Sequence, residues 1–163
     1  MKKRCDWAKD EPNIRYHDEE WGVTEHNDKK LFEFLILEGA QAGLSWSTIL
    51  NRRDGYCDAF SNFDVVIVST YTQNHIKKLV QNKAIIRNKL KINSAINNAK
   101  KFIEIQKQFG TFDEYLWGFV NHKTINNKFK KHSDLPAYTI ISENLSNDLK
   151  KRGFTFVGPI ICY

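Results

Sequence analysis

The 163-residue sequence has few of the residues that break or staple a chain: 8 glycines, 3 prolines and 3 cysteines. The scarcity of glycine and proline excludes long linkers, so we expect a single domain over residues 1–163. Three cysteines cannot form a paired disulfide framework, and nothing resembles a secretory signal, which predicts a reduced, cytoplasmic protein. No apolar run approaches the ~18 residues of a membrane span, so no membrane contact is expected.

Basic residues outnumber acidic residues by 25 to 19, and the excess is unevenly spread along the chain. Residues 1–76 hold 9 basic and 13 acidic residues, whereas residues 77–131 hold 13 and 3. A basic segment within one domain is expected of a face that binds a polyanion such as nucleic acid. A lysine-rich solvated surface would give the same numbers, so charge alone favours neither interpretation.

The dominant hydrophobic period is helical, and it predicts an all-α fold with six or more helices. A short β-branched run, 65–68, could form a strand, but its isolation among helices favours a helical turn or a buried extended piece. The expected helices start at Asp28, at Ser45 (running towards Phe60) and at Thr70, and cover 87–109, 112–120 and Ser142 to Gly153.

Residues 149–163 predict a helical hairpin. Gly153 ends the first helix, because glycine adopts a positive φ at little cost, and Pro159 suits the first position of the second helix. A bare turn at Gly158 would expose backbone N–H groups at a helix N-terminus, where phosphate binds, with the basic residues 150–152 nearby. A tight turn between two helices, without any ligand, is the alternative.

The N-terminal segment, residues 4–23, is too polar for a core helix and too aromatic for a free tail. Cys5 and His17 are both plausible zinc ligands. Two ligands do not make a tetrahedral site, so spacing alone favours a buried thiol and a surface histidine.

Glu38 ends an apolar helix, and a turn of small residues then leads to Trp46. A carboxylate is costly to bury without a partner. A pocket that combines a carboxylate with aromatic faces suits a flat ligand that is cationic or carries an amino group. A solvated acid at a helix end is the commoner fate of a glutamate and remains the alternative.

Together these segments resemble the DNA-3-methyladenine glycosylase I family. The most specific strings are Tyr-His-Asp at 16–18, followed by Glu-Trp-Gly at 20–22, and Gln-Ala-Gly-Leu-Ser-Trp at 41–46. The matching stretches run in order over almost the whole chain: 4–7, 16–22, 37–50, 85–87, 117–121 and 149–159.

The resemblance implies a helix-hairpin-helix DNA glycosylase fold and a monofunctional hydrolase without lyase activity. Its partner would be double-stranded alkylated DNA, from which it flips and excises 3-methyladenine as a monomer, with no organic cofactor. The resemblance assigns base recognition to Glu38, stacking walls to Tyr16 and Trp46, and further pocket walls to Trp7 and Trp21. For contact with DNA, it assigns a wedge to Gly43 and Leu44 and phosphate contacts to Lys151, Gly153, Phe156 and Gly158.

The sequence departs from the family at its C-terminus. Family chains usually continue past the hairpin, where a histidine and a cysteine join the residues matching Cys5 and His17 in a structural zinc site. This sequence stops at Tyr163, so the fold is expected to be truncated after the hairpin and Cys5 and His17 to be half a zinc site. The alternative functions are a weak or inactive relative that acts as a DNA-binding module, and a helical adaptor without a nucleic-acid role.

Overall fold

The structure is a computed structural model that describes residues 4–163. The predicted domain covers residues 1–163, and its N-terminal segment covers residues 1–23. The first three residues of both lie outside the described part. Every regular element within 4–163 is a helix, which confirms the all-α prediction. In the same part of the chain, no helix is long and apolar enough to cross a bilayer. The helices are α1 (Asn13–Glu19), α2 (Asp28–Gln41), α3 (Trp46–Leu50), α4 (Arg53–Ala59), α5 (Val65–Ser69), α6 (Gln73–Leu79), α7 (Lys89–Phe109), α8 (Phe112–Gly118), α9 (Ile140–Lys151) and α10 (Pro159–Cys162), with 3-10 turns η1 (Ser61–Phe63) and η2 (His132–Asp134).

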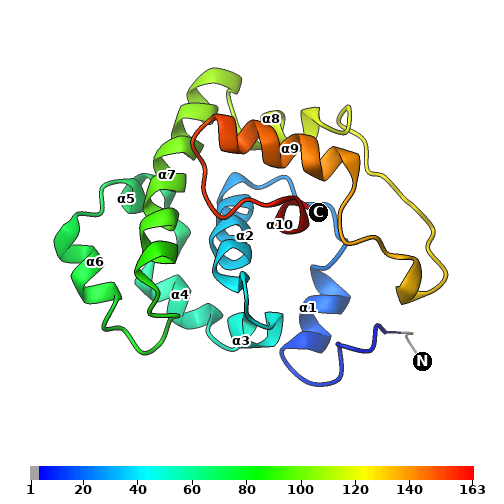
Figure 1. Cartoon of the computed structure of the whole chain (residues 1–163), viewed down its shortest axis with the longest axis horizontal. Helices are drawn as coiled ribbons and strands as arrows, with labels where there is room; N and C mark the ends of the chain where they lie inside the picture. Colours follow the sequence, from blue (N-terminus) through cyan, green and yellow to red (C-terminus); the bar gives the residue numbers. More distant parts are fainter. Residues whose placement is uncertain (1–3) are drawn as a thin grey trace.

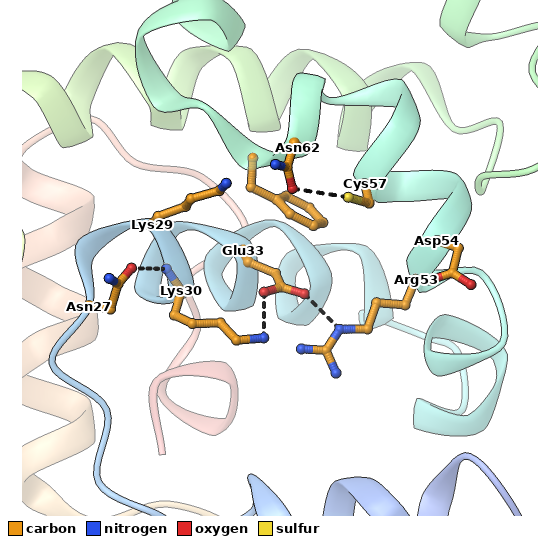
Figure 2. Close-up of a pocket in the computed structure, with 9 residues that line it drawn as sticks. Asn27, Lys29, Lys30, Glu33, Arg53, Asp54, Cys57 and Asn62 are labelled. Carbon is orange, nitrogen blue, oxygen red and sulfur yellow. Dashed lines mark hydrogen bonds and ion pairs between the residues drawn. The ribbon is translucent and has the colours of Figure 1, made fainter.

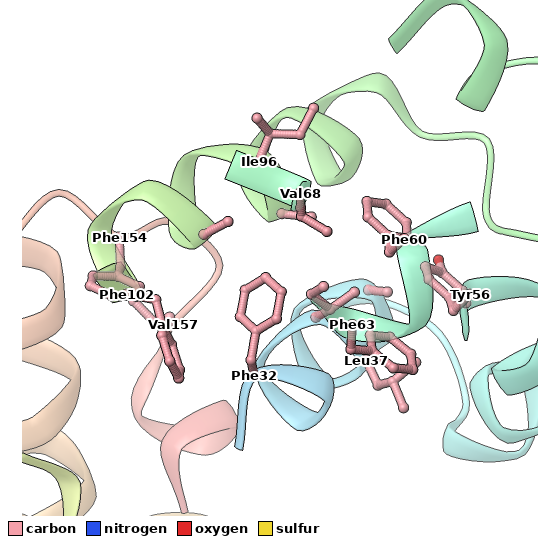
Figure 3. Close-up of a cluster of buried hydrophobic side chains, with 14 of the residues drawn as sticks. Phe32, Leu37, Tyr56, Phe60, Phe63, Val68, Ile96, Phe102, Phe154 and Val157 are labelled. Atoms are coloured by element: carbon pink, nitrogen blue, oxygen red, sulfur yellow. The ribbon is translucent and has the colours of Figure 1, made fainter. Parts of the chain in front are cut away.

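The helices α2 and α7 pack against each other at the centre of the molecule (Figure 1). Phe32 of α2 meets Phe102 of α7 edge-on, with ring centroids 5.3 Å apart, and Phe102 stacks on Phe112 at 4.1 Å. The cluster continues to Leu37 and to Phe154 of the C-terminal hairpin (Figure 3). Burying each such side chain contributes about 1.5–3 kcal/mol, so this cluster holds α2, α7 and the C-terminal hairpin on one scaffold.

The N-cap of α2 lies one residue before the cap predicted at Asp28. It is Asn27, whose side chain accepts the N–H of Lys30 at 3.1 Å. The Asp28 carboxylate instead accepts the N–H groups of Phe112 at 2.9 Å and Asp113 at 2.8 Å. Those N–H groups open α8 and have no partner within it, so Asp28 caps a helix distant in sequence. A local capping rule could not foresee this long-range contact.

The helix predicted from Ser45 towards Phe60 is divided into two. Ser45 caps α3 as predicted, and its hydroxyl accepts the N–H of Thr48 at 3.2 Å. The helix α3 ends at Leu50, and α4 starts at Arg53. Ile49, Tyr56 and Phe60 keep a helical spacing across this polar break, which explains why the sequence indicated one helix.

The β-branched run forms α5, which confirms the prediction of a helical turn over a strand. Asp64 caps it by accepting the N–H of Ile67 at 3.0 Å. Thr70, predicted to open the next helix, ends this one, and its hydroxyl donates to the carbonyl of Ile67 at 2.7 Å. Thr72 therefore caps α6 in its place.

The C-terminal hairpin is formed by α9 and α10. Thr139 rather than Ser142 caps α9, and the two residues form a reciprocal capping box. Gly153 follows α9 with a φ of +92°, and Pro159 is the first residue of α10, both as predicted. Gly158 precedes α10 with an ordinary φ of −64°, so its backbone conformation does not require glycine.

Side chains of α7 hold the turn between α9 and α10. The Asn98 amide donates to the carbonyl of Thr155 at 2.9 Å, and its oxygen accepts the N–H of Thr155 at 3.0 Å. Hydroxyls of Thr155 and Ser94 meet at 2.7 Å, and the Asn97 amide donates to the carbonyl of Gly153 at 2.8 Å. The turn is therefore fixed to the central helix rather than by its own residues alone.

Candidate active site

Four aromatic side chains singled out in the sequence gather beside α1. Tyr16 lies on α1 and Trp46 opens α3, and their ring centroids are 5.1 Å apart with a tilt of 55°. Trp7 lies 6.1 Å from Tyr16 and 5.4 Å from Trp21. A base sandwiched between two parallel rings needs centroids about 7 Å apart, twice the contact distance of carbon atoms. Tyr16 and Trp46 therefore form two adjacent walls of a corner rather than two facing walls.

Glu38 lies in the last turn of α2, next to this corner. Burial raises its pKa from the ordinary 4.5 to about 7, and no basic side chain of the described residues pairs with its carboxylate. Burial, and then the charge of Glu38, also raise the pKa of Tyr16. Glu38 is thus half-buried at the helix end without a basic partner, which favours the pocket interpretation over that of a fully solvated acid.

Trp46 adds a donor that has no acceptor. Its indole Nε1 is buried and is the one buried side-chain nitrogen or oxygen of residues 4–163 without a hydrogen bond. Buried polar groups in folded proteins are nearly always paired, so an unpaired one calls for an explanation. Glu38 and Trp46 thus present an acceptor and a donor in an aromatic corner, and this combination suits a flat cationic base.

The loop between α2 and α3 carries the two predicted wedge residues. Gly43 has a φ of +76°, a conformation that L side chains rarely adopt. Leu44 is partly exposed, at 36%, and its N–H donates to the carbonyl of Gln41 at 2.7 Å. The structure therefore presents an apolar side chain at the surface directly after the pocket helix.

Cys5 and His17 lie together, but their contact does not fit a zinc site. The backbone N–H of Cys5 donates to Nε2 of His17 at 3.3 Å, and Nδ1 lies 3.0 Å from the Asp18 carboxylate. Both imidazole nitrogens are thus occupied by protein groups. The described residues contain no group of three histidine, cysteine or acidic side chains able to hold a metal ion. The residues present therefore do not fit the expected structural zinc.

The predicted phosphate contacts of the hairpin divide into two groups. The N–H of Gly153 already donates to the carbonyl of Lys150 at 3.0 Å, and only its positive φ serves the turn. Lys151 is exposed, and Phe156 has a positive φ of 55°. The backbone bonds of the described residues use neither the N–H of Phe156 nor that of Gly158. These two N–H groups and Lys151 can therefore contact a phosphate.

An open groove of about 440 Å³ lies beside α2 and α4 (Figure 2). Arg53 dominates it, donating to Glu20 at 2.6 and 2.7 Å and to Glu33 at 2.6 Å. Lys30 also pairs with Glu33, at 2.8 Å. Because these charges satisfy one another, the groove serves as a joint between α1, α2 and α4. Sequence reasoning missed Arg53, since no spacing rule pairs residues so far apart.

A family model described as methyladenine glycosylase matches residues 7–163. The chain belongs to the methyladenine glycosylase family. It is 44% identical over 162 residues to DNA-3-methyladenine glycosylase 1 of Escherichia coli K12, covering 99% of this chain and 87% of that protein. It is 42% identical to the DNA-3-methyladenine glycosylase of Haemophilus influenzae, covering 100% of this chain and 89% of the relative.

Solved structures of the family share the fold. The 3-methyladenine DNA glycosylase I of Staphylococcus aureus, solved to explain its recognition of 3-methyladenine, matches with a TM-score of 0.94 at 33% identity, covering 98% of this chain and 85% of that one. The predicted family, fold class and enzyme class, a DNA-3-methyladenine glycosylase, are therefore confirmed. The expected truncation after the hairpin stays a prediction.

Proposed function

We propose that this glycosylase flips 3-methyladenine out of alkylated double-stranded DNA and hydrolyses its N-glycosidic bond. The observation that carries the proposal is the half-buried carboxylate of Glu38 beside the aromatic corner, which has no basic partner and whose pKa desolvation raises to about 7. The names of the relatives from Escherichia coli and Haemophilus influenzae, and the recognition of 3-methyladenine by the Staphylococcus aureus protein, support it.

The chemistry of the methylated base matches this corner. Methylation at N3 makes the adenine cationic, so a carboxylate in a poorly solvated site attracts it more strongly than neutral adenine. When the glycosidic bond breaks, its electron pair leaves with the base and neutralises the base. Water supplies a hydroxyl to C1′ of the sugar and releases a proton. Because the base leaves readily, the protein contributes mainly extrusion, desolvation and selection.

Each pocket residue then has a distinct role. Glu38 accepts hydrogen bonds from the edge of the flipped base, and the rings of Tyr16 and Trp46 contact its faces and edge. Trp7 lies against both Tyr16 and Trp21, and the two tryptophans close the outer side of the corner. The buried N–H of Trp46 gains in the flipped base the acceptor that it lacks.

The DNA itself is held outside the pocket. We infer that Leu44, presented by the turn at Gly43, fills the gap that the flipped nucleotide leaves. The free N–H groups of Phe156 and Gly158, together with Lys151, would contact the phosphates as in a helix-hairpin-helix motif.

We further infer a monofunctional enzyme without lyase activity. A lyase needs an amine that attacks C1′ as a Schiff-base nucleophile. Lys91, which lies beside the α2–α3 loop, has its ammonium group bonded to two carbonyl oxygens and is not available for this attack. The reaction as proposed needs only water, without an organic cofactor.

A single copy of the chain supplies the whole proposed site, so we propose that residues 1–163 act as one catalytic domain and as a monomer. One hydrophobic cluster runs from α2 to the hairpin, which supports a single domain over the described residues. The three cysteines carry free thiols, which supports a cytoplasmic location. The assembled pocket favours the enzyme over an inactive DNA-binding module.

Release of bases from alkylated DNA tests the proposal. We expect the wild-type protein to release 3-methyladenine, and Glu38→Gln to lower the rate by at least about 100-fold, as loss of a key electrostatic contact does in other enzymes. Duplex binding should remain nearly unchanged. Glu104→Gln, which removes an exposed carboxylate on α7, is the matched control and should keep full activity. A folded wild-type protein that releases no 3-methyladenine would refute the proposal.

A further inference from the structure

We propose that Lys91 of α7 is a positioning residue that holds the α2–α3 loop in the conformation needed to extrude a paired base. The loop comprises residues 42–45 and carries the wedge residue Leu44. The inference rests on the proposed function and deepens it, because it concerns a residue that touches neither the base nor the reacting bond.

The ammonium group of Lys91 closes the C-terminal end of α2. Its Nζ donates to the carbonyl of Ala40 at 2.8 Å and to that of Ala42 at 2.6 Å. The last carbonyls of a helix have no partner within the helix, and a positive charge at this end is favourable. The last turn of α2 contains no basic residue of its own, so α7 supplies the charge.

These contacts span the point where the helix becomes the loop. Ala40 is still helical and buried, whereas Ala42 is the C-cap, with φ −48° and ψ +118°. One ammonium group therefore ties the end of the pocket helix and the start of the wedge loop to the same point on α7. Lys91 lines a small internal cavity together with Ile36 of α2 and Tyr56 of α4.

A second set of bonds extends this anchor to the wedge residue. The Gln41 amide donates to the carbonyl of Leu44 at 2.9 Å, and the N–H of Leu44 donates to the carbonyl of Gln41 at 2.7 Å. The segment 41–44 is thus a closed turn that moves as a unit. Lys91 at its base sets where Leu44 stands relative to Glu38, three residues before the turn.

The functional consequence follows from the conformational entropy that the loop loses when it becomes ordered. A wedge that is already in place loses little conformational freedom when it enters the duplex, so more of the binding energy goes into extruding the base. Without Lys91, the carbonyls of Ala40 and Ala42 lose their partner and the loop must be ordered during flipping. The effect should therefore be largest where a base pair opposes extrusion.

The test is Lys91→Met, which keeps the stem and removes the ammonium group. Excision is compared for 3-methyladenine paired with thymine and for the same base opposite an abasic site, where no pairing resists extrusion. We expect the rate on the paired substrate to fall by at least about tenfold, equivalent to about 1.4 kcal/mol, and the rate on the unpaired substrate to change less than about threefold. Affinity for free 3-methyladenine should be unchanged within about twofold.

Lys100→Met, an exposed lysine on the same helix, is the matched control and should leave both rates unchanged. Lys91→Arg keeps donors for both carbonyls and should restore most of the rate on the paired substrate. In a Leu44→Ala background, Lys91→Met should have little further effect, because Lys91 acts through the wedge. If Lys91→Met does not fold, Lys91→Gln, which keeps one donor, is expected to give an intermediate ratio.

Equal rates for Lys91→Met and wild type on the paired substrate would overturn the inference. An equal loss on both substrates, or a parallel loss of free-base affinity, would also overturn it, because either would show a general defect of the pocket. Failure of the proposed function is distinguishable, since the wild-type protein would then release no base from either substrate.

Discussion

The turn of the C-terminal hairpin and the aromatic corner around Glu38 are opposite solutions to the placement of polar groups. In the hairpin turn, Asn98 satisfies both the N–H and the carbonyl of Thr155. In the corner, the half-buried carboxylate of Glu38 has no pairing cation, and the buried indole N–H of Trp46 has no acceptor. The first arrangement stabilises the folded chain, and the second reduces its stability. Groups left unpaired at such a cost mark the place where a ligand completes the structure.

The largest effect on the free energy of unfolding is expected from a substitution that disrupts the hairpin turn. Asn98→Ala removes two bonds to Thr155 and leaves its N–H and carbonyl partly unpaired next to α7. We expect a loss of about 3 kcal/mol in the free energy of unfolding, the sum of the penalty for the unsatisfied Thr155 N–H and of one hydrogen bond lost by the carbonyl, which keeps its bond from Ser94. Asn97→Ala, which removes a single bond to the Gly153 carbonyl, is the control and should cost about 1 kcal/mol. Denaturant unfolding measures both losses. Equal small losses would contradict the stabilising role of the two Asn98 hydrogen bonds.

A substitution of Glu38 in the aromatic corner should raise the free energy of unfolding rather than lower it. The pKa of Glu38 is about 7 in the folded protein and 4.5 ordinarily, so ionisation costs folding stability as the pH rises from 4.5 to 7. Glu38→Gln removes this cost. We expect the variant to be more stable than wild type by up to about 3 kcal/mol at pH 8 and by little at pH 4, because a tenfold change in an ionisation constant corresponds to about 1.36 kcal/mol. Thermal unfolding at both pH values measures this, and a variant less stable at pH 8 would refute it.

The smallest effect on stability is expected from a comparison of an unpaired and a paired indole N–H. Trp46→Phe removes an N–H that has no acceptor, whereas Trp117→Phe removes one that donates to the carbonyl of Glu25 at 2.9 Å. Both variants lose ring volume, but only the second loses a hydrogen bond. We therefore expect Trp117→Phe to be less stable than Trp46→Phe by about 1 kcal/mol, while only Trp46→Phe impairs excision. The reverse order of stabilities would contradict the unpaired state of Trp46.

The sequence predicted the fold class, because helical periodicity is a local signal, and the aromatic residues that it singled out for the pocket lie together in the structure. Helix starts were misplaced where the deciding contact is distant, as for Asp28, which caps α8 rather than α2. The residues that support the site, Lys91 and Asn98, escaped notice for the same reason. Each acts on backbone groups more than 45 positions away in the chain, and no spacing rule reaches that far.

The most direct measurement is the pKa of Glu38 itself. Carbon-13 NMR of its side-chain carboxyl gives this pKa in the presence and absence of 3-methyladenine. We expect a pKa of about 7 in the free protein, because burial penalises the charge. We expect it to fall when the base binds, because a hydrogen bond donated by the base favours the charged carboxylate. A pKa near the ordinary 4.5 in the free protein, unchanged by the base, would show that Glu38 is solvated and would contradict its proposed role.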